Sequence, residues 1–114
     1  MKGPYSLTTS NIGIVVTRKS PGVYILYVAC NGQKLYVGRS DTDVRARLKR
    51  HVGECSPTAR SAYSYFKFDY ATSPKKAFER ECNLWHYHRP PDNLNHPQRP
   101  AGTSWKCPRC KIFG

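Results

Sequence analysis

The sequence predicts a small α+β domain in which a few strands form a sheet covered by helices. Two strand-like runs, residues 22–30 and 34–38, are rich in Val, Ile and Tyr and meet at the turn-forming pair Asn31-Gly32. Two later segments, residues 41–52 and 73–89, repeat apolar side chains with helical spacing. A chain of 114 residues has room for one modest core, so these elements are expected in a single domain.

The composition indicates a polyanionic partner. The chain has 19 Lys and Arg against 7 Asp and Glu, a formal charge of +12. Nucleic acid is the default partner of such a domain, although ribosomal-type structural proteins and membrane-surface peptides share the charge. No run approaches the ~18 apolar residues of a membrane span, and the N-terminus lacks the apolar core of a signal peptide. We therefore expect a cytoplasmic protein with no membrane partner, whose five cysteines are thiols or metal ligands.

The chain divides into a lead-in, a core and a tail that belong to one domain. The lead-in, residues 1–21, contains the apolar run from Ile12 to Val16, which is either an edge strand or a segment that packs on the core. Residues 22–95 form the expected core, and residues 96–114 form a basic tail rich in proline.

The register of the first two strands decides whether Tyr24 and Tyr36 share a face of the sheet. A two-residue turn at Asn31-Gly32 would pair Tyr36 with Tyr27 and leave Tyr24 on the opposite face. A three-residue loop that starts one residue earlier, with its glycine left-handed in a bulge, would pair Tyr36 with Leu26 and place Tyr24 on the same face. The sequence suits both turns. Because one site would need both tyrosines, we predict the three-residue loop.

The helix over residues 41–52 is predicted to begin with Asp41 as its N-cap and to seat an apolar stripe on the sheet. Arg47 and His51 lie four residues apart beside this stripe, so both can point along one groove. The other basic residues are predicted to face outward, either as a solvated surface or as contacts to a polyanion: Arg45, Lys49 and Arg50.

The second helix carries an acidic residue among apolar ones. Residues 61–71 are predicted as a third strand, and the helix that follows begins with Ser73 as N-cap and Pro74 at its first position. Glu81 falls in the apolar stripe of this helix. A carboxylate there is costly to desolvate unless a cation or hydrogen bonds meet it. Glu81 is therefore either a metal ligand or half of a structural ion pair with Arg47 or another base.

Five motifs in order resemble those of the GIY-YIG nucleases. They are Gly22-Val23-Tyr24, Tyr36-Val37-Gly38, the R-x-x-x-H segment from Arg47 to His51, the segment Glu81 to Trp85, which is similar to E-N-x-L-I, and Asn93, which follows Glu81 by 12 residues (93 − 81). The resemblance covers residues 22 to 95. The interval from Tyr36 to Arg47 is one residue longer than the family pattern, and the role of Arg39 is open.

The resemblance implies a three-stranded antiparallel sheet flanked by helices, in a small stand-alone domain that hydrolyses DNA with one divalent metal. Glu81 would be the sole protein ligand of Mg²⁺ or Mn²⁺. Tyr24 would take a proton from the attacking water or orient it, with Tyr36 hydrogen-bonded beside it; which tyrosine is the base stays open. Arg47 would stabilise the developing charge, and Asn93 would hold the periphery of the site.

The tyrosines would need help from cations, because a phenol with its usual pKa near ~10 is a poor base. Arg47, His51 and Arg39 are expected to lower that pKa. Asn95 is an alternative to Asn93 that the spacing disfavours.

The tail contains half of a zinc site, Cys107-Pro108-Arg109-Cys110. The pair either shares a structural Zn²⁺ with two further ligands or is reduced and unoccupied. His86 and His88 are interpreted as surface residues at a helix end. The candidates for the further ligands are His86, His88, His96, Cys55 and Cys82.

The expected partner is DNA, double or single stranded, with no small-molecule substrate and an open oligomeric state. Trp105 is a candidate for base stacking. The basic residues expected to contact phosphates are Arg39, Arg45, Lys49, Arg50, Lys106, Arg109 and Lys111. Two other functions compete with the nuclease: a non-catalytic nucleic-acid-binding module of the same fold, and a basic structural protein similar to a zinc ribbon.

Overall fold

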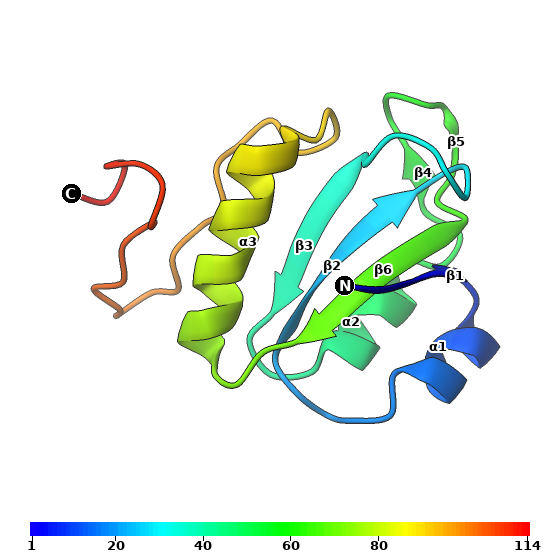
Figure 1. Cartoon of the computed structure of the whole chain (residues 1–114), viewed down its shortest axis with the longest axis horizontal. Coiled ribbons are helices and arrows are strands. Elements are labelled where there is room, and N and C mark those ends of the chain that lie inside the picture. Colours follow the sequence, from blue (N-terminus) through cyan, green and yellow to red (C-terminus); the bar gives the residue numbers. More distant parts are fainter.

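The computed structural model describes all 114 residues and contains a four-stranded sheet with the order β1-β6-β2-β3. The strands are β1 (Lys2–Ser6), β2 (Gly22–Tyr27), β3 (Tyr36–Ser40) and β6 (Tyr65–Tyr70), and a separate hairpin is formed by β4 (Cys55–Ser56) and β5 (Ser61–Ala62). The helices are α1 (Thr9–Val15), α2 (Val44–Arg50) and α3 (Pro74–His88). Helix α3 runs beside β3, and the C-terminal tail lies along α3 on the side away from the strands (Figure 1).

The predicted α+β class with an antiparallel sheet flanked by helices is confirmed, and all strand pairs in the sheet are antiparallel. The sheet has one strand more than the resemblance implied, because β1 pairs with β6 at the edge. This strand could not be predicted from the sequence because it contains Gly3 and Pro4, which both weaken strands and are tolerated mainly at edges.

The apolar run of the lead-in forms a helix rather than an edge strand. Thr8 is the N-cap of α1, and its side chain accepts a hydrogen bond from the amide of Asn11. Ile12 and Val16, one turn apart, are both fully buried. The run therefore packs on the core, which is the second of the two predicted arrangements.

Helix α2 begins two residues later than predicted. Asp43 is its N-cap, with its carboxylate 3.1 Å from the amide of Ala46. Asp41, the predicted cap, instead accepts a hydrogen bond from Nε of Arg39. Val44 and Leu48 are fully buried against the sheet as the stripe requires. Val52, the last residue of the stripe, lies beyond the helix and is exposed.

The predicted register of β2 and β3 is correct, but the predicted loop is wrong. Leu26 pairs with Tyr36 and Tyr24 pairs with Gly38, so both tyrosines lie on one face. The connection spans residues 28–35 rather than three residues. Gly32 does not have the positive φ expected of a bulge, and its amide donates to the carbonyl of Ala29 at 2.9 Å.

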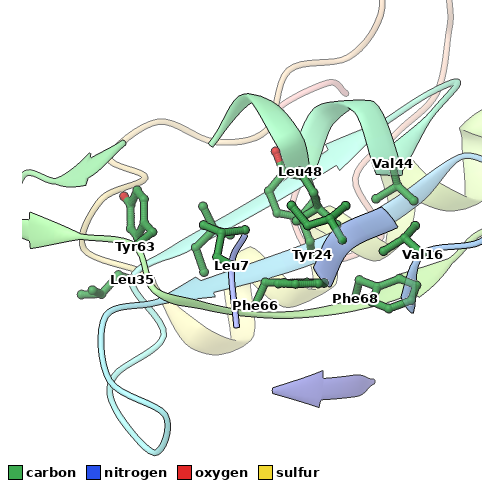
Figure 2. Packing of buried hydrophobic residues seen from close by; sticks show 11 residues of the cluster. Leu7, Val16, Tyr24, Leu35, Val44, Leu48, Tyr63, Phe66 and Phe68 are labelled. Atoms are coloured by element: carbon green, nitrogen blue, oxygen red, sulfur yellow. The ribbon is translucent and has the colours of Figure 1, made fainter. Parts of the chain in front are cut away.

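The two faces of the sheet carry separate apolar clusters. On the first face, Tyr24, Phe66 and Phe68 pack with Val44 and Leu48 of α2 (Figure 2). On the opposite face, Ile25, Tyr27 and Val37 form a smaller cluster against Leu84 of α3. No helix here combines the length and the apolar character required to cross a membrane.

Candidate functional site

A polar cleft of about 380 Å³ wraps around the open edge of β3. Tyr36 and Arg39 lie three positions apart on this strand, so their side chains leave opposite faces of the sheet and reach the cleft from both sides. The lining residues are Tyr36, Arg39, Asp41, Arg47, Glu81, Asn93, Pro97 and Gln98. Of the six predicted catalytic or metal-binding residues, four line this cleft: Tyr36, Arg47, Glu81 and Asn93. A fifth, His51, lies against the ring of Tyr36.

Tyr24 lies behind the cleft, where its hydroxyl group contacts His51. The distance from Oη of Tyr24 to Nε2 of His51 is 2.7 Å, and Nδ1 of His51 lies 3.2 Å from a carboxylate oxygen of Glu54. A carboxylate can only accept, so Nδ1 carries a proton and the neutral imidazole accepts the phenolic hydrogen at Nε2. The result is a series of hydrogen bonds from Tyr24 through His51 to Glu54. The predicted hydrogen bond between Tyr24 and Tyr36 is absent, and their rings lie 6.3 Å apart.

Glu54 was missed by reasoning from the sequence. It follows α2 in a turn, three residues after His51, and nothing in that turn marks it as functional. The spacing of three residues is the only signal that could have indicated the contact, because a turn brings such positions together.

The glycine of the second motif makes room for Tyr24. A Cβ atom on Gly38 would lie well inside the contact distance of the phenol ring of Tyr24. Because Gly38 pairs directly with Tyr24 across the strands, the ring can pass over the bare backbone and reach His51. The motif therefore needs glycine at this position for steric reasons.

The surroundings of the tyrosines raise their pKa, which corrects the expectation that nearby cations lower it. Burial raises the pKa of Tyr24 well above its usual value, the neighbouring Tyr36 adds to the effect, and Arg47 opposes it. Burial also raises the pKa of Tyr36, with the carboxylates of Glu81 and Glu54 acting in the same direction. Tyr24 is 1 % exposed, and desolvation of a buried phenolate costs more than one arginine returns.

Burial also shifts the pKa of His51, both of whose ring nitrogens have hydrogen-bond partners. Burial lowers the pKa of the imidazole, the charge and hydrogen bond of Glu54 raise it, and the charge of Arg47 lowers it further. His51 is therefore neutral at pH 7 and can serve as the acceptor for the hydroxyl hydrogen of Tyr24.

Arg39 joins the acidic groups of the cleft. Its Nη1 lies 2.5 Å from Oε1 of Glu81, its Nε lies 2.8 Å from Asp41, and its Nη2 donates to the carbonyl of Gln98 at 2.8 Å. Glu81 is 8 % exposed, as the apolar stripe predicted. Burial raises the pKa of its carboxyl group, although the charge and hydrogen bond of Arg39 act in the opposite direction. The structural ion pair foreseen for Glu81 is thus made with Arg39 rather than Arg47.

Asn93 forms hydrogen bonds with the backbone in the middle of β3. Its Oδ1 accepts from the amide of Val37, and its Nδ2 donates to the carbonyl of the same residue, both at 2.8 Å. The preceding residue, Asp92, accepts hydrogen bonds from Ser56, Thr58 and Tyr63. These contacts fasten the segment after α3 to β3 and to the β4-β5 hairpin. Asn95, the alternative to Asn93, is exposed.

Not all of the residues predicted to contact phosphate are exposed. Lys49 and Arg50 are exposed on α2, and Lys106, Arg109 and Lys111 are exposed in the tail. Arg45 is half-buried and donates to the carbonyl of Gly13 in α1, so it does not face outward as predicted. Arg45 lies between the two helices because α1 covers the position that the sequence left open.

The tail brings its two cysteines to two histidines. His86, His96, Cys107 and Cys110 each place one ligand atom within 4.8 Å of the others. His86 therefore lies in this cluster and is not simply a surface residue. The ring of Trp105 packs on Phe78 with the centroids 6.0 Å apart, so Trp105 is not a free platform for a base. A separate cleft of about 310 Å³ between β6 and the start of α3 contains none of the predicted site residues.

Comparison with known proteins agrees with this arrangement. The family model described as the GIY-YIG catalytic domain matches residues 20–93. The structure is similar to that of the GIY-YIG N-terminal endonuclease domain of UvrC from Thermotoga maritima, which was solved with its catalytic divalent cation, magnesium. The TM-score is 0.54 and the sequence identity is 22%, and the match covers 72% of this chain and 92% of that domain. A point mutant of that domain, also bound to its catalytic divalent cation, gives a TM-score of 0.55 and 20% identity over 73% and 92%. At this identity the similarity is one of fold. No curated protein matches the sequence.

Proposed function

The chain belongs to the GIY-YIG catalytic domain family, and on this premise we propose that it is a divalent-metal-dependent endonuclease that hydrolyses DNA phosphodiester bonds. The observation that supports this function most strongly is the convergence of Tyr36, Arg47 and Glu81 on one polar cleft. These residues come from β3, α2 and α3. The formal charge of +12 adds the general attraction for a polyanion that such a substrate requires.

The donor groups of the cleft fit a hard divalent cation. Oε1 of Glu81 accepts from Arg39, while Oε2 makes no hydrogen bond within the chain. Mg²⁺ prefers oxygen ligands and keeps most of its waters, so one carboxylate in an open polar cleft is a sufficient protein contribution. Glu81 would hold the ion, and Asp41, which Arg39 bridges to Glu81, is the other carboxylate in the cleft. The magnesium bound by the similar UvrC domain supports this choice of metal.

A divalent ion on Glu81 would supply positive charge that polarises a phosphoryl oxygen and stabilises the leaving oxygen. Arg47 lines the same cleft from α2 and is exposed. Its guanidinium is a bidentate donor suited to phosphate oxygens, so it would bind the scissile phosphate and stabilise the charge that develops there.

Tyr36 is the tyrosine that would orient the attacking water. Its ring lines the cleft, and its hydroxyl group has no hydrogen-bond partner within the chain. Tyr24 is buried and its hydroxyl hydrogen is committed to His51. We therefore assign contact with the water to Tyr36, and assign to Tyr24, His51 and Glu54 the task of holding the ring of Tyr36 from behind.

The discriminating experiment compares Glu81→Gln with Glu79→Gln in the cleavage of supercoiled plasmid and of single-stranded DNA with Mg²⁺. Glu81→Gln keeps the shape of the side chain but removes its charge, so cleavage should fall by at least about 100-fold. Glu79 lies on the same helix, pairs with Lys76 and is outside the cleft, so its variant should cleave as the wild type does. Equal cleavage by the Glu81→Gln variant and the wild type would eliminate the proposed site.

One observation favours a second function, a nucleic-acid-binding module without catalysis. Arg39 already neutralises Glu81, and an arginine in this place competes with a metal for the carboxylate. In that case the wild type would retain DNA on a filter at low salt but would not cleave it with Mg²⁺ or Mn²⁺. Cleavage by the wild type that depends on Glu81 excludes this second function.

A further inference from the structure

We propose that His86, His96, Cys107 and Cys110 bind one structural Zn²⁺ ion that fastens the C-terminal tail to α3. The two histidines come from the end of α3 and from the segment after it, and the two cysteines come from the last turn of the tail. Two thiolates and two imidazoles are a complete ligand set for a closed, four-coordinate zinc centre. This assignment does not depend on whether the chain cleaves DNA.

The distances between ligand atoms suit a tetrahedral ion. Sγ of Cys107 lies 3.4 Å from Nε2 of His86, and Sγ of Cys110 lies 3.4 Å from Nε2 of His96. With Zn–S near ~2.3 Å and Zn–N near ~2.0 Å, a tetrahedral centre separates sulfur from nitrogen by about 3.5 Å. All four ligand atoms lie within 4.8 Å of one another, so a small inward movement of the widest pair completes the coordination.

The hydrogen bonds around the cluster prepare its atoms for a metal. Nδ1 of His96 lies 2.8 Å from the carbonyl oxygen of Pro97, which can only accept, so Nδ1 carries the proton and Nε2 presents its lone pair to Cys110. This is the usual second contact of a zinc-bound histidine, which fixes the tautomer and the ring orientation. The amide of Arg109 donates to Sγ of Cys107 at 3.3 Å, a contact that favours the charged form of the sulfur.

One side of the cluster is covered by apolar and aromatic side chains, although only Cys107 of the four ligands is buried and the other three are half-buried. Cys107 is 6 % exposed and packs with Phe78 and Cys82 of α3. The ring of Trp85 lies against both His86 and His96, with centroid distances of 5.1 Å and 5.2 Å. With four ligands from the protein, a tetrahedral ion would have no coordination position left for water, as in structural zinc sites.

The tail needs such a fastening because it has little else to hold it. Residues 96–114 contain no helix or strand, and ordering each of them costs backbone entropy. Its large apolar contacts are mainly those of Trp105 and Phe113 with Phe78. The free energy of zinc binding contributes directly to folding when the site exists only in the folded chain, so the ion would offset the ordering of this segment.

The metal centre also supports one wall of the cleft. Gln98 follows the ligand His96 by two residues, lines the cleft and accepts a hydrogen bond from Arg39 through its carbonyl. Zinc would thus hold the segment that positions Arg39 against Glu81. Loss of zinc should loosen the tail first and the cleft wall with it, while the sheet and α2 remain folded.

The experiment measures zinc in the full chain, expressed without a histidine tag and purified under reducing conditions. We expect about one zinc per chain by elemental analysis, and native mass spectrometry should show the ion bound with loss of the thiol protons. Cys110→Ser and His86→Gln should each lower the zinc content by about tenfold or more. Their matched controls are Cys55→Ser, an exposed thiol, and His88→Gln, two residues further along α3; both should keep wild-type zinc.

A second measurement guards against variants that fail to fold. The wild type, stripped of metal by a chelator, is titrated with Co²⁺ and followed by the visible absorption of tetrahedral thiolate coordination, then by limited proteolysis with and without Zn²⁺. Saturation at one equivalent, with tail cleavage suppressed only when metal is present, is the expected result. Wild-type chain that binds no stoichiometric metal after zinc is added, that shows a Cys107–Cys110 disulfide by mass, or that matches the zinc content of Cys110→Ser would overturn the proposal.

Discussion

Tyr24 and Tyr36 share a face of the sheet, yet their hydroxyl groups have different surroundings. The hydroxyl of Tyr24 donates to His51, while that of Tyr36 has no partner in the chain and meets the cleft. The side chain that contributes to folding is therefore distinct from the side chain that would contact substrate. Phenylalanine at each position removes one oxygen atom and separates these two roles.

We predict that Tyr36→Phe loses activity without losing stability. Removing a hydroxyl group that positions the reacting water should reduce the rate of DNA cleavage by about 100-fold, whereas the midpoint of thermal unfolding should not change. Tyr24→Phe should lower the free energy of unfolding by about 1 kcal/mol, because it leaves Nε2 of His51 without its partner. Paired measurements of cleavage rate and unfolding test both effects, and a Tyr36→Phe variant as active as the wild type would contradict the assignment.

Asp92 gives a prediction of pH dependence. Burial alone would raise the pKa of its carboxyl, but the hydrogen bonds from Ser56, Thr58 and Tyr63 outweigh burial and lower the pKa below its usual value. An acid whose pKa is lowered by folding stabilises the protein above its unfolded pKa, ~3.9 for Asp, and this stabilisation is lost as the pH falls through the folded pKa.

Asp92→Asn should therefore reduce the free energy of unfolding by about 1–2 kcal/mol at neutral pH, and the difference from the wild type should shrink once the pH falls below about 4. Urea unfolding at several pH values measures this difference. A gap that stays constant from neutral to acidic pH would show that the charge of Asp92 has no part in it.

Much of the candidate site could be predicted from residue types and spacing. Helical periodicity predicted that Glu81 lies on the apolar stripe of its helix, and the residue is buried there. The resemblance assigned Asn93 to the periphery of the site, but it did not indicate that Asn93 contacts β3. The partners of these residues could not be predicted. Arg39 meets Glu81, and Glu54 meets His51, through side-chain geometry that leaves no repeating pattern in the sequence.

At the scale of elements, the β2-β3 pair carries the site because its register is fixed. The face of Tyr24 and Leu26 packs on α2, and a slip of one residue would move this whole set to the face of α3. The register was predictable only from the need for a shared site, because the run over residues 22–30 is apolar at nearly every position and suits either register. The loop was not, since a connection of eight residues and one of three can hold the same pairs in register.

The strand pair also depends on the glycine of β3. We predict that Gly38→Ala destabilises the chain by about 1–3 kcal/mol, because the added methyl group would overlap the ring of Tyr24. Displacement of that ring should break its contact with His51 and lower the rate of DNA cleavage as well. Chemical unfolding and the cleavage assay measure the two consequences.

The matched control is Gly13→Ala in α1. Here the new methyl group would meet only the flexible end of Arg45, and alanine favours a helix over glycine by about 0.5–1 kcal/mol. This variant should be at least as stable as the wild type. A Gly38→Ala chain that unfolds at the same denaturant concentration as the wild type would refute the steric role of the glycine.

Over the whole molecule, exposed basic residues lie on α2 and in the tail, two segments that also supply Arg47 and Gln98 to the cleft. Lys49 and Arg50 are exposed on α2, and the exposed basic residues of the tail follow α3. Composition predicted the polyanionic partner, but it could not show that α1 would cover Arg45 or that Arg39 would be held by acids. Those outcomes depend on contacts between segments far apart in the chain.

Binding to DNA should weaken steeply as salt increases, because each phosphate contact releases counterions. We predict that Lys49→Gln reduces the slope of log K against log salt concentration by about one. Lys75→Gln, which removes the same charge from an exposed position at the start of α3, should leave the slope unchanged. Fluorescence anisotropy with a catalytically inactive Glu81→Gln background measures both slopes, and equal slopes for the two variants would remove Lys49 from the interface.

The paired hydrogen bonds between Asn93 and Val37 have a consequence for self-association. An edge strand with free amides and carbonyls is a template on which another chain can add a strand and begin to aggregate. Asn93 occupies one amide and one carbonyl in the middle of β3, so no neighbouring strand can form a continuous ladder there. The side chain that borders the cleft therefore also blocks strand addition at Val37, and we expect Asn93→Ala to increase the tendency of the chain to self-associate through this edge.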